Sequence, residues 1–289
     1  MKVSHRTLKA PATVSGIGLF SEIPCSVTIK PAEQGIVFTR SGATIPATIE
    51  HLSSQPAHAA FESMPPRSTN LDLPDGTVIL TVEHLLSTLA GLGVSAATIE
   101  IQGPELPIGD GSARALTTAI LEAGLVDLDE QVDPEPGLSA GFTVGNPGGP
   151  CIKVTPAPSP SFVYHLDYGP KSPIPAQRAQ WDGSPEAYAR EVAPARTYCL
   201  DYEAQAMQNA GLFKSFTPRD LLVIGEDGPI DNACRFDNEP ARHKLLDLIG
   251  DVALAGLPLA PVRIEAYGSG HALNHQLAHR LARLMRGTV

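Results

Sequence analysis

Long apolar runs, paired cysteines and an excess of positive charge are all missing from this sequence. A helix that crosses a bilayer needs roughly 18 to 20 consecutive apolar residues, and no stretch of the chain approaches that length. The first residues, MKVSHRTLKAPATV, also lack the continuous apolar core of a secretory signal peptide. We therefore expect a cytoplasmic protein without a membrane-spanning segment.

The cysteine and charge content excludes further classes of protein. The four cysteines, Cys25, Cys151, Cys199 and Cys234, form no C-x-x-C pair, which argues against a cysteine-ligated zinc site and is typical of a reducing compartment. Lysine and arginine number 21 against 31 acidic residues, giving a net charge of −10. Such a chain repels nucleic acid and anionic membranes, so an anionic substrate must be held by local cations.

Two common hydrolase motifs are also missing. No H-E-x-x-H motif is present, which excludes that type of metalloprotease. The segments GSGH and GDGS contain serine, but neither forms the G-x-S-x-G turn of a serine hydrolase. In IGDGSA, Asp110 and Gly111 are typical of a turn, so we assign Asp110 and Ser112 a structural role.

The patterns that are present predict two α+β domains. The chain has 289 residues, of which 43% are hydrophobic, enough for two modest cores. Alternating strand-like segments surround an apolar helical pattern on each side of an acidic divider at 127–137, which shows neither helical nor strand periodicity. We predict domains at 1–130 and 137–289. The helical segments at 81–93 and 241–256 share a histidine near two leucines and a later glycine, which hints at a duplicated unit.

The helix predicted at 241–256 carries an unusual polar stripe. His243, Asp247 and Asp251 are spaced i, i+4, i+8 and therefore project from one side of the helix. An imidazole and a carboxylate one turn apart can bind the same divalent ion. The alternative is a solvent-facing histidine and aspartate with a mild attraction.

The other predicted helix offers a third ligand. Glu83 and His84 open the segment at 81–93, so His84 could complete a His₂Asp zinc site with one position free for water. Glu83 could then act on that water as a general base. The alternative is an acid favoured by the helix dipole beside a half-buried histidine.

A further candidate, His271, follows the glycines of YGSGHALN at the start of the last predicted helix. Amides at a helix start would lower its pKa, whereas a carboxylate such as Asp251 could restore it; the alternative is a surface histidine. His271, His275 and His279 share one helix face, and we expect that face to be solvated because no carboxylate accompanies it in the segment.

Several separated blocks together resemble the zinc-dependent UDP-3-O-acyl-N-acetylglucosamine deacetylases of lipid A biosynthesis. The blocks are RTLKAPATVSGIGLFS, LTVEHLLSTLAGLGVSAATIEIQGPELPIGDGSA, PARTY, RFDNEPARHKLLDLIGD and GSGHALN. They follow the family's order over nearly the whole chain. The resemblance implies two α/β sandwich domains of related topology with the active site between them.

The resemblance also implies roles for individual residues. Zinc would be bound by His84, His243 and Asp247, and Glu83 would deprotonate the attacking water. The remaining assignments are His271 as general acid, Asp251 as its orienting partner, Thr197 as a stabiliser of the oxyanion and Lys244 as a ligand of the substrate phosphate. The implied partner is an acylated, nucleotide-linked N-acetyl sugar, and we expect a monomer.

The chain departs from the family pattern around the substrate. Phe20 replaces the usual histidine of GIGLF, Gly268 replaces a cation that contributes to diphosphate binding, and Tyr198 stands where phenylalanine is usual. Phe213 and Phe216 occupy a stretch that lines the family's acyl passage. If this stretch is helical, the two rings share a face and fill the passage, which predicts a preference for short acyl groups; alternatively, the stretch is repositioned and the passage opens elsewhere.

Two other functions are compatible with the sequence. The chain could deacetylate a different N-acetylated sugar, since its substrate envelope is altered while its catalytic set is intact. It could also be a catalytically silent homologue that binds sugar, which absence of bound zinc after purification would favour.

Overall fold

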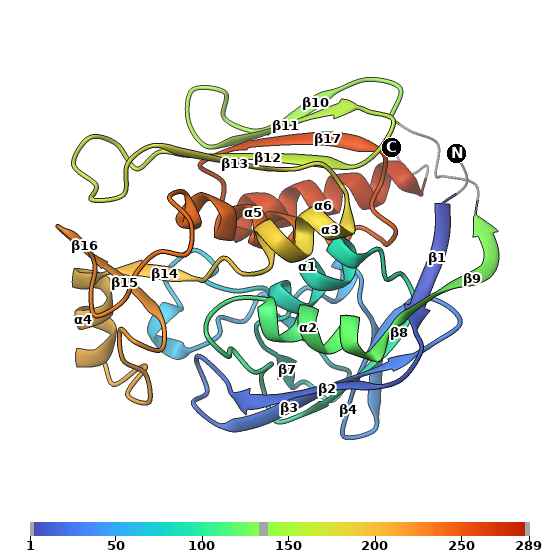
Figure 1. The fold of residues 1–289 in the computed structure, drawn as a ribbon, viewed down its shortest axis with the longest axis horizontal. Coiled ribbons are helices and arrows are strands. Elements are labelled where there is room, and N and C mark those ends of the chain that lie inside the picture. Colours follow the sequence, from blue (N-terminus) through green and yellow to red (C-terminus); the bar gives the residue numbers. More distant parts are fainter. Residues whose placement is uncertain (1–2, 133–137, 287–289) are drawn as a thin grey trace.

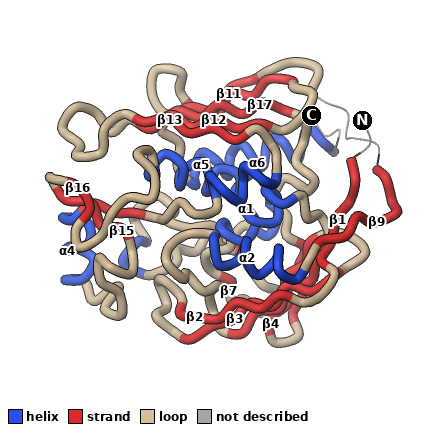
Figure 2. Tube along the Cα trace, in the orientation of Figure 1, coloured by secondary structure: helices blue, strands red, loops and turns tan. Residues whose placement is uncertain are grey.

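Two five-stranded sheets form the outer layers of the molecule, and the main helices lie between them (Figures 1 and 2). The computed structural model describes residues 3–132 and 138–286. Both halves mix helices with largely antiparallel sheets, which confirms the predicted α+β class.

The first half of the chain builds the lower sheet of Figure 1, with strands in the order β2, β3, β8, β4, β5. Neighbours are antiparallel except for the parallel pair of β4 and β8. The elements are β2 (Ala12–Ile17), β3 (Pro24–Pro31), β4 (Ile36–Arg40), β5 (Ala43–Pro46), β8 (Ala97–Gln102), α1 (Glu83–Leu92) and α2 (Arg114–Ala123). Alternation along β3 buries Val27 and Ile29 against the helices, while Lys30 faces outward and pairs with Glu100 of β8.

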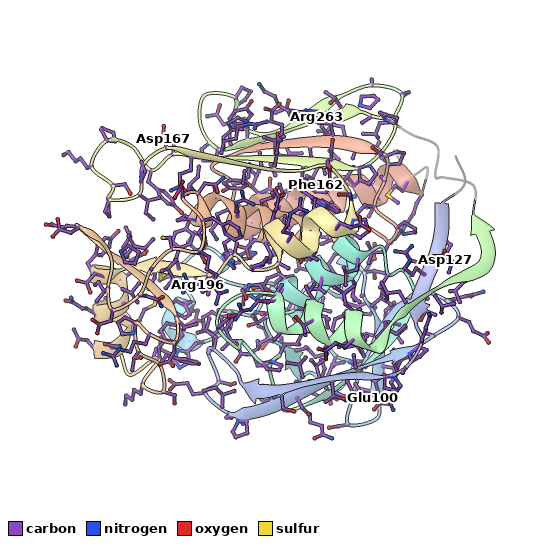
Figure 3. The ribbon with its side chains drawn as sticks, in the orientation of Figure 1. Glu100, Asp127, Phe162, Asp167, Arg196 and Arg263 are labelled. Atoms are coloured by element: carbon purple, nitrogen blue, oxygen red, sulfur yellow. The ribbon has the colours of Figure 1, made fainter. Side chains whose placement is uncertain are left out.

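The second half builds the upper sheet, in the order β10, β11, β17, β12, β13. Here too neighbours are antiparallel except for one parallel pair, β12 and β17. The elements are β10 (Phe142–Gly145), β11 (Cys151–Pro156), β12 (Ser161–Leu166), β13 (Gln177–Trp181), β17 (Val262–Tyr267), α5 (Glu239–Ala253) and α6 (His271–Met285). Phe162 is buried beneath this sheet, whereas Arg263 is exposed on its outer side (Figure 3).

The two halves are repeats of one unit. In each half, four strands of the sheet are followed by a helix, the central strand and a second helix. In both sheets the last strand along the chain lies between the second and the third. The first helices correspond even in sequence, because His84 precedes Gly91 by the same seven positions that separate His243 from Gly250. The hint of duplication in the sequence is therefore borne out by the topology.

The first helices of the two repeats, α1 and α5, cross in the centre of the molecule. Gly250 permits the crossing, because a Cβ atom there would lie 2.1 Å from the carbonyl oxygen of Glu83. Leu85, Leu89 and Ile249 are fully buried around this contact. The crossing sets the first turn of α1 directly against α5.

A smaller lobe projects at the left of Figure 1. It contains α4 (Asp201–Asn209) and a three-stranded sheet of β14 (Tyr198–Leu200), β15 (Leu222–Gly225) and β16 (Gly228–Pro229). The remaining short elements are β6 (Leu71–Asp72), β7 (Val78–Ile79), α3 (Pro185–Ala187), a π-helical turn at Tyr188–Val192 and 3₁₀ turns at Ile49–His51 and Ala59–Phe61.

The acidic divider contains a strand that its composition did not predict. β9 (Leu125–Val132) pairs antiparallel with β1 (Val3–Leu8). Arg6 Nε and Asp127 Oδ1 form an ion pair at 3.0 Å between the two strands. The prediction of no regular structure is therefore wrong as far as Val132; a strand can carry charged residues such as Asp127 where its side chain stays exposed to solvent. Residues 133–137 lie outside the described residues, and the division at 130 and 137 remains our proposal.

Among the described residues, none of the helices combines the length and the apolar character that a membrane crossing requires.

Candidate active site

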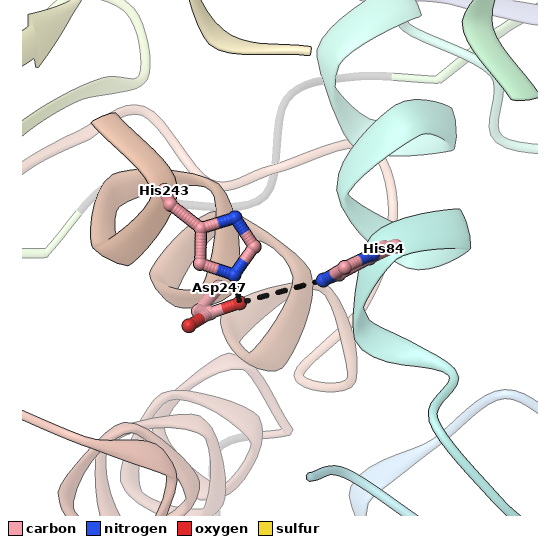
Figure 4. Close-up of side chains that lie close together, drawn as sticks. All are labelled: His84, His243 and Asp247. Carbon is pink, nitrogen blue, oxygen red and sulfur yellow. Dashed lines mark ion pairs between the residues drawn. The ribbon is translucent and has the colours of Figure 1, made fainter. Parts of the chain in front are cut away.

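Three buried side chains converge where α1 meets α5. Asp247 Oδ1 lies 3.3 Å from His243 Nε2 and 3.9 Å from His84 Nε2. Figure 4 shows the two imidazoles approaching Asp247 from different helices. The donor atoms lie within 4.8 Å of one another, and each residue is less than 10% exposed. The structure thus brings together the three residues that the sequence proposed as metal ligands.

The protonation of this group suits a divalent cation. Burial and the neighbouring His243 lower the pKa of His84 to about 3, and burial lowers the pKa of His243, so both rings are neutral. His243 Nδ1 lies 3.1 Å from the carbonyl oxygen of Ala195 and donates to it, which leaves the Nε2 lone pair free. Two neutral imidazoles and a carboxylate fit a zinc ion.

Lys244 completes the surroundings of Asp247. Its Nζ donates to Asp247 Oδ2 at 2.7 Å, so the other oxygen, Oδ1, is the one that faces the histidines. Burial alone would raise the pKa of Asp247, but its contacts with the His243 imidazole and with the Lys244 ammonium hold it below its usual range. The carboxylate is therefore ionised at neutral pH.

Glu83 and His271 lie in the same small cavity, which has a volume of about 40 Å³. Burial raises the pKa of Glu83 to about 8, although the charge of His271 opposes the shift. Its Oε2 accepts a hydrogen bond of 2.9 Å from the backbone N–H of Thr69. Thr197 and Lys244 also line this cavity, which therefore brings together the predicted catalytic and metal-binding residues of both repeats except Asp251.

Asp251 lies behind His271, out of the cavity. Its Oδ2 accepts hydrogen bonds from His271 Nδ1 at 2.8 Å and from Asn274 Nδ2 at 2.9 Å. Burial alone would lower the pKa of His271, but the Asp251 carboxylate raises it to about 9. His271 is therefore positively charged at neutral pH. Its Nδ1–H is bonded to Asp251, and its Nε2–H is the second donor of the ring.

His275 was wrongly expected to be solvated. It is 7% exposed, and its Nε2 lies 3.8 Å from Asp251 Oδ1, so the carboxylate that its own helix lacks comes from α5. Only His279 of the three-histidine face is exposed. Tertiary packing, not the helix pattern, decides which of these histidines is buried.

A larger apolar cavity of about 200 Å³ adjoins the first. Tyr198, Phe213 and Phe216 line it, and Phe20, Arg67 and Thr197 line both cavities. The assumption that Phe213 and Phe216 share a helical face is wrong, because Phe213 has a φ of 57° and begins a non-helical turn. The two rings form part of the wall around an open volume instead of a solid plug.

Arg67 and Thr69 were not identified from the sequence. Arg67 offers a guanidinium at the junction of the two cavities, beside Phe20, and its Nη2 lies 3.7 Å from Glu203 Oε1. Both residues belong to a loop without helical or strand pattern, so periodicity could not identify them.

Asp110 has the structural contacts that we expected from the sequence: its oxygens accept hydrogen bonds from Ser112 Oγ and Arg235 Nη2, each at 2.6 Å.

Comparison with known proteins gives matches over almost the entire chain. The family model described as LpxC, UDP-3-O-acyl N-acetylglycosamine deacetylase, matches residues 5–283. A Nostoc protein named UDP-3-O-acyl-N-acetylglucosamine deacetylase is 36% identical, with 98% of this chain and 99% of that protein covered. Proteins of the same name from Synechocystis and Chlamydia trachomatis are each 34% identical, with 96% of this chain and 98% and 94% of theirs covered.

Proposed function

Because this chain belongs to the UDP-3-O-acyl N-acetylglycosamine deacetylase family, we propose that it hydrolyses the N-acetyl group of UDP-3-O-acyl-N-acetylglucosamine, a step of lipid A biosynthesis. The observation that carries the proposal is the buried His84, His243 and Asp247 group beside Glu83 and His271. An amide is unreactive, so its hydrolysis needs an activated water, a place for negative charge and a proton for the departing amine.

The metal in this proposal is zinc. Two imidazoles and one carboxylate are ordinary zinc ligands, and three protein ligands leave a coordination position open. Held there, such an ion would act as a Lewis acid on the acetamide carbonyl and would make water easier to deprotonate. The neutral state of both histidines and the ionised state of Asp247 support this assignment.

The chain's own residues move the protons. Glu83 takes the proton of the attacking water, since its carboxylate lines the cavity beside the three candidate metal ligands. His271, positively charged, stabilises the developing oxyanion and then gives its proton to the amine nitrogen. The Thr197 hydroxyl donates a hydrogen bond to the same oxyanion.

The two cavities divide the substrate between them. The apolar cavity, with Tyr198, Phe213 and Phe216 on its wall, receives the acyl chain. Lys244 keeps N–H donors beyond its bond to Asp247 and binds a phosphate. Gly268 has no side chain that could contact the diphosphate, so in this proposal Lys244 makes that contact. We expect the chain to act as a cytoplasmic monomer.

Metal analysis joined to a deacetylation assay tests the proposal. Purified protein should contain one zinc ion per chain and release acetate from UDP-3-O-acyl-N-acetylglucosamine. Glu83→Gln should retain the metal but lose turnover by about 10² to 10⁴, the usual effect of removing a general base. Glu100→Gln, on the outer face of the lower sheet, is the matched control (Figure 3). Active protein without metal, or near-normal turnover of Glu83→Gln at saturating substrate, would contradict these assignments.

A further inference from the structure

Thr69 contacts Glu83 directly and shares the partner Asp251 with His271, whose Nδ1 also lies 3.4 Å from the Thr69 hydroxyl oxygen. It is fully buried in the loop before β6. Its backbone N–H donates to Glu83 Oε2 at 2.9 Å, and its hydroxyl donates to Asp251 Oδ1. One residue therefore connects the carboxylate of Glu83 to the carboxylate of Asp251 behind His271.

The direction of the hydrogen bonds around Thr69 can be derived. A hydroxyl has one hydrogen, and the ionised Asp251 can only accept, so the Thr69 hydrogen goes to Asp251. His275 Nε2 lies 2.7 Å from the same hydroxyl oxygen and must be the donor there. The chain of bonds runs from His275 through Thr69 to Asp251, and His275 carries its proton on Nε2.

The hydrogen bond from Thr69 completes the set of donors to Asp251. Thr69 binds Oδ1, while His271 and Asn274 bind Oδ2. Asp251 is fully buried, so the carboxylate can rotate only by breaking one of these bonds. Fixing its plane fixes the His271 ring that depends on it.

The group of Asp251, His271 and His275 also has the spacing of a metal site. Its donor atoms are already paired with one another, however: His271 Nδ1 gives its hydrogen to Asp251, and the Thr69 hydroxyl occupies the position between Asp251 and His275. The contacts describe a closed hydrogen-bonded network.

We infer that Thr69 and His275 are positioning residues for the reaction: through Asp251 they hold His271, and through the Thr69 backbone they hold Glu83. The inference rests on the proposed deacetylase function for its kinetic consequence. Its structural part, the network itself, can be measured without turnover.

The kinetic test uses Thr69→Val, which removes the hydroxyl but keeps the shape and the backbone N–H. We expect kcat to fall about 10- to 100-fold, the usual effect of removing an outer partner of an active-site group, with KM and metal content unchanged. Thr69→Ser should restore most of the activity. Thr117→Val is the matched control, because Thr117 is also buried, in α2, and its hydroxyl has no hydrogen-bond partner among the described residues.

His275 gives an independent pair of variants. His275→Gln places an amide donor near the position of Nε2 and should retain most of kcat, whereas His275→Leu should lower it as Thr69→Val does. If His275 had only a structural role, His275→Gln and His275→Leu would both lower thermal stability, and their kcat values would not differ. Equal activity of the Gln and Leu variants, or kcat of Thr69→Val within twofold of the parent, would overturn the inference.

Nitrogen-15 NMR of the histidine side chains tests the network without an assay. We expect protonation at Nε2 of His275 and at both nitrogens of His271 at neutral pH, with the His275 signal changed by Thr69→Val and not by Thr117→Val. If His275 is instead protonated only at Nδ1, the network is wrong. If NMR agrees but the parent protein deacetylates nothing, the proposed function fails while the network stands.

Discussion

Replacing Gly250 by alanine should separate the two halves of the active site. The added Cβ atom would lie 2.1 Å from the Glu83 carbonyl oxygen, whereas ordinary contacts begin at 3.4 Å, so the helices must part by 3.4 − 2.1, or about 1.3 Å. The obstacle is backbone, which no rotamer change can relieve. Glu83 and the adjacent His84 would move away from His243 and Asp247.

The expected cost falls on catalysis more than on folding. Overpacking typically costs about 1 to 3 kcal/mol, but alanine regains about 1 kcal/mol of helix propensity over glycine, so we expect net destabilisation of at most about 2 kcal/mol. A displacement of about 1 Å in a reacting group can lower activity about 100-fold. We therefore expect a large fall in kcat/KM and weaker metal binding in a protein that still folds.

The assay compares kcat/KM, metal content and urea unfolding for Gly250→Ala and Gly149→Ala. Gly149 lies in the turn between β10 and β11, where an added Cβ atom meets nothing within 4 Å, so that variant should match the parent. Normal kcat/KM and full metal content in Gly250→Ala would refute the argument that this glycine sets the spacing of the site.

Three further outcomes follow from the same contacts. Asp247→Ala should lower zinc occupancy sharply, because three ligands leave no redundancy; elemental analysis after dialysis checks this. Glu239 is fully buried against Arg196. Burial alone would raise the pKa of Glu239, but the ion pair with Arg196 lowers it. The ion pair therefore stabilises the fold above the unfolded pKa of about 4.3, and this stabilisation is lost as the pH falls through the lower folded pKa. Glu239→Gln should therefore cost about 3 to 5 kcal/mol at pH 7 and much less near pH 2, measured by urea unfolding. Phe216→Gly should widen the apolar cavity, so kcat/KM should keep rising with acyl length beyond the point where the parent levels off, by up to about 0.8 kcal/mol per methylene; an unchanged length profile would mean that Phe216 does not limit the cavity.

Local patterns in the sequence were sufficient for the elements and for part of the site. Periodicity predicted the helical segments that became α1, α5 and α6, because the apolar residues of each pack into a shared core. The four-residue spacing of His243 and Asp247 within one helix is enough by itself to place both side chains on the same side. His84 could be proposed as their partner from chemistry and resemblance, since a zinc site needs a third ligand.

Only the tertiary structure decided which distant residues meet. Gly250 allows α1 to approach α5, and that crossing joins ligands from two repeats. His275 looked solvated because Asp251, which makes its burial favourable, lies on another helix. Thr69 and Arg67 have no periodic signal, and the positive φ of Phe213 breaks the helix that its spacing from Phe216 suggested. These features depend on contacts between segments far apart in the chain, and a pattern of neighbouring residues carries no information about them.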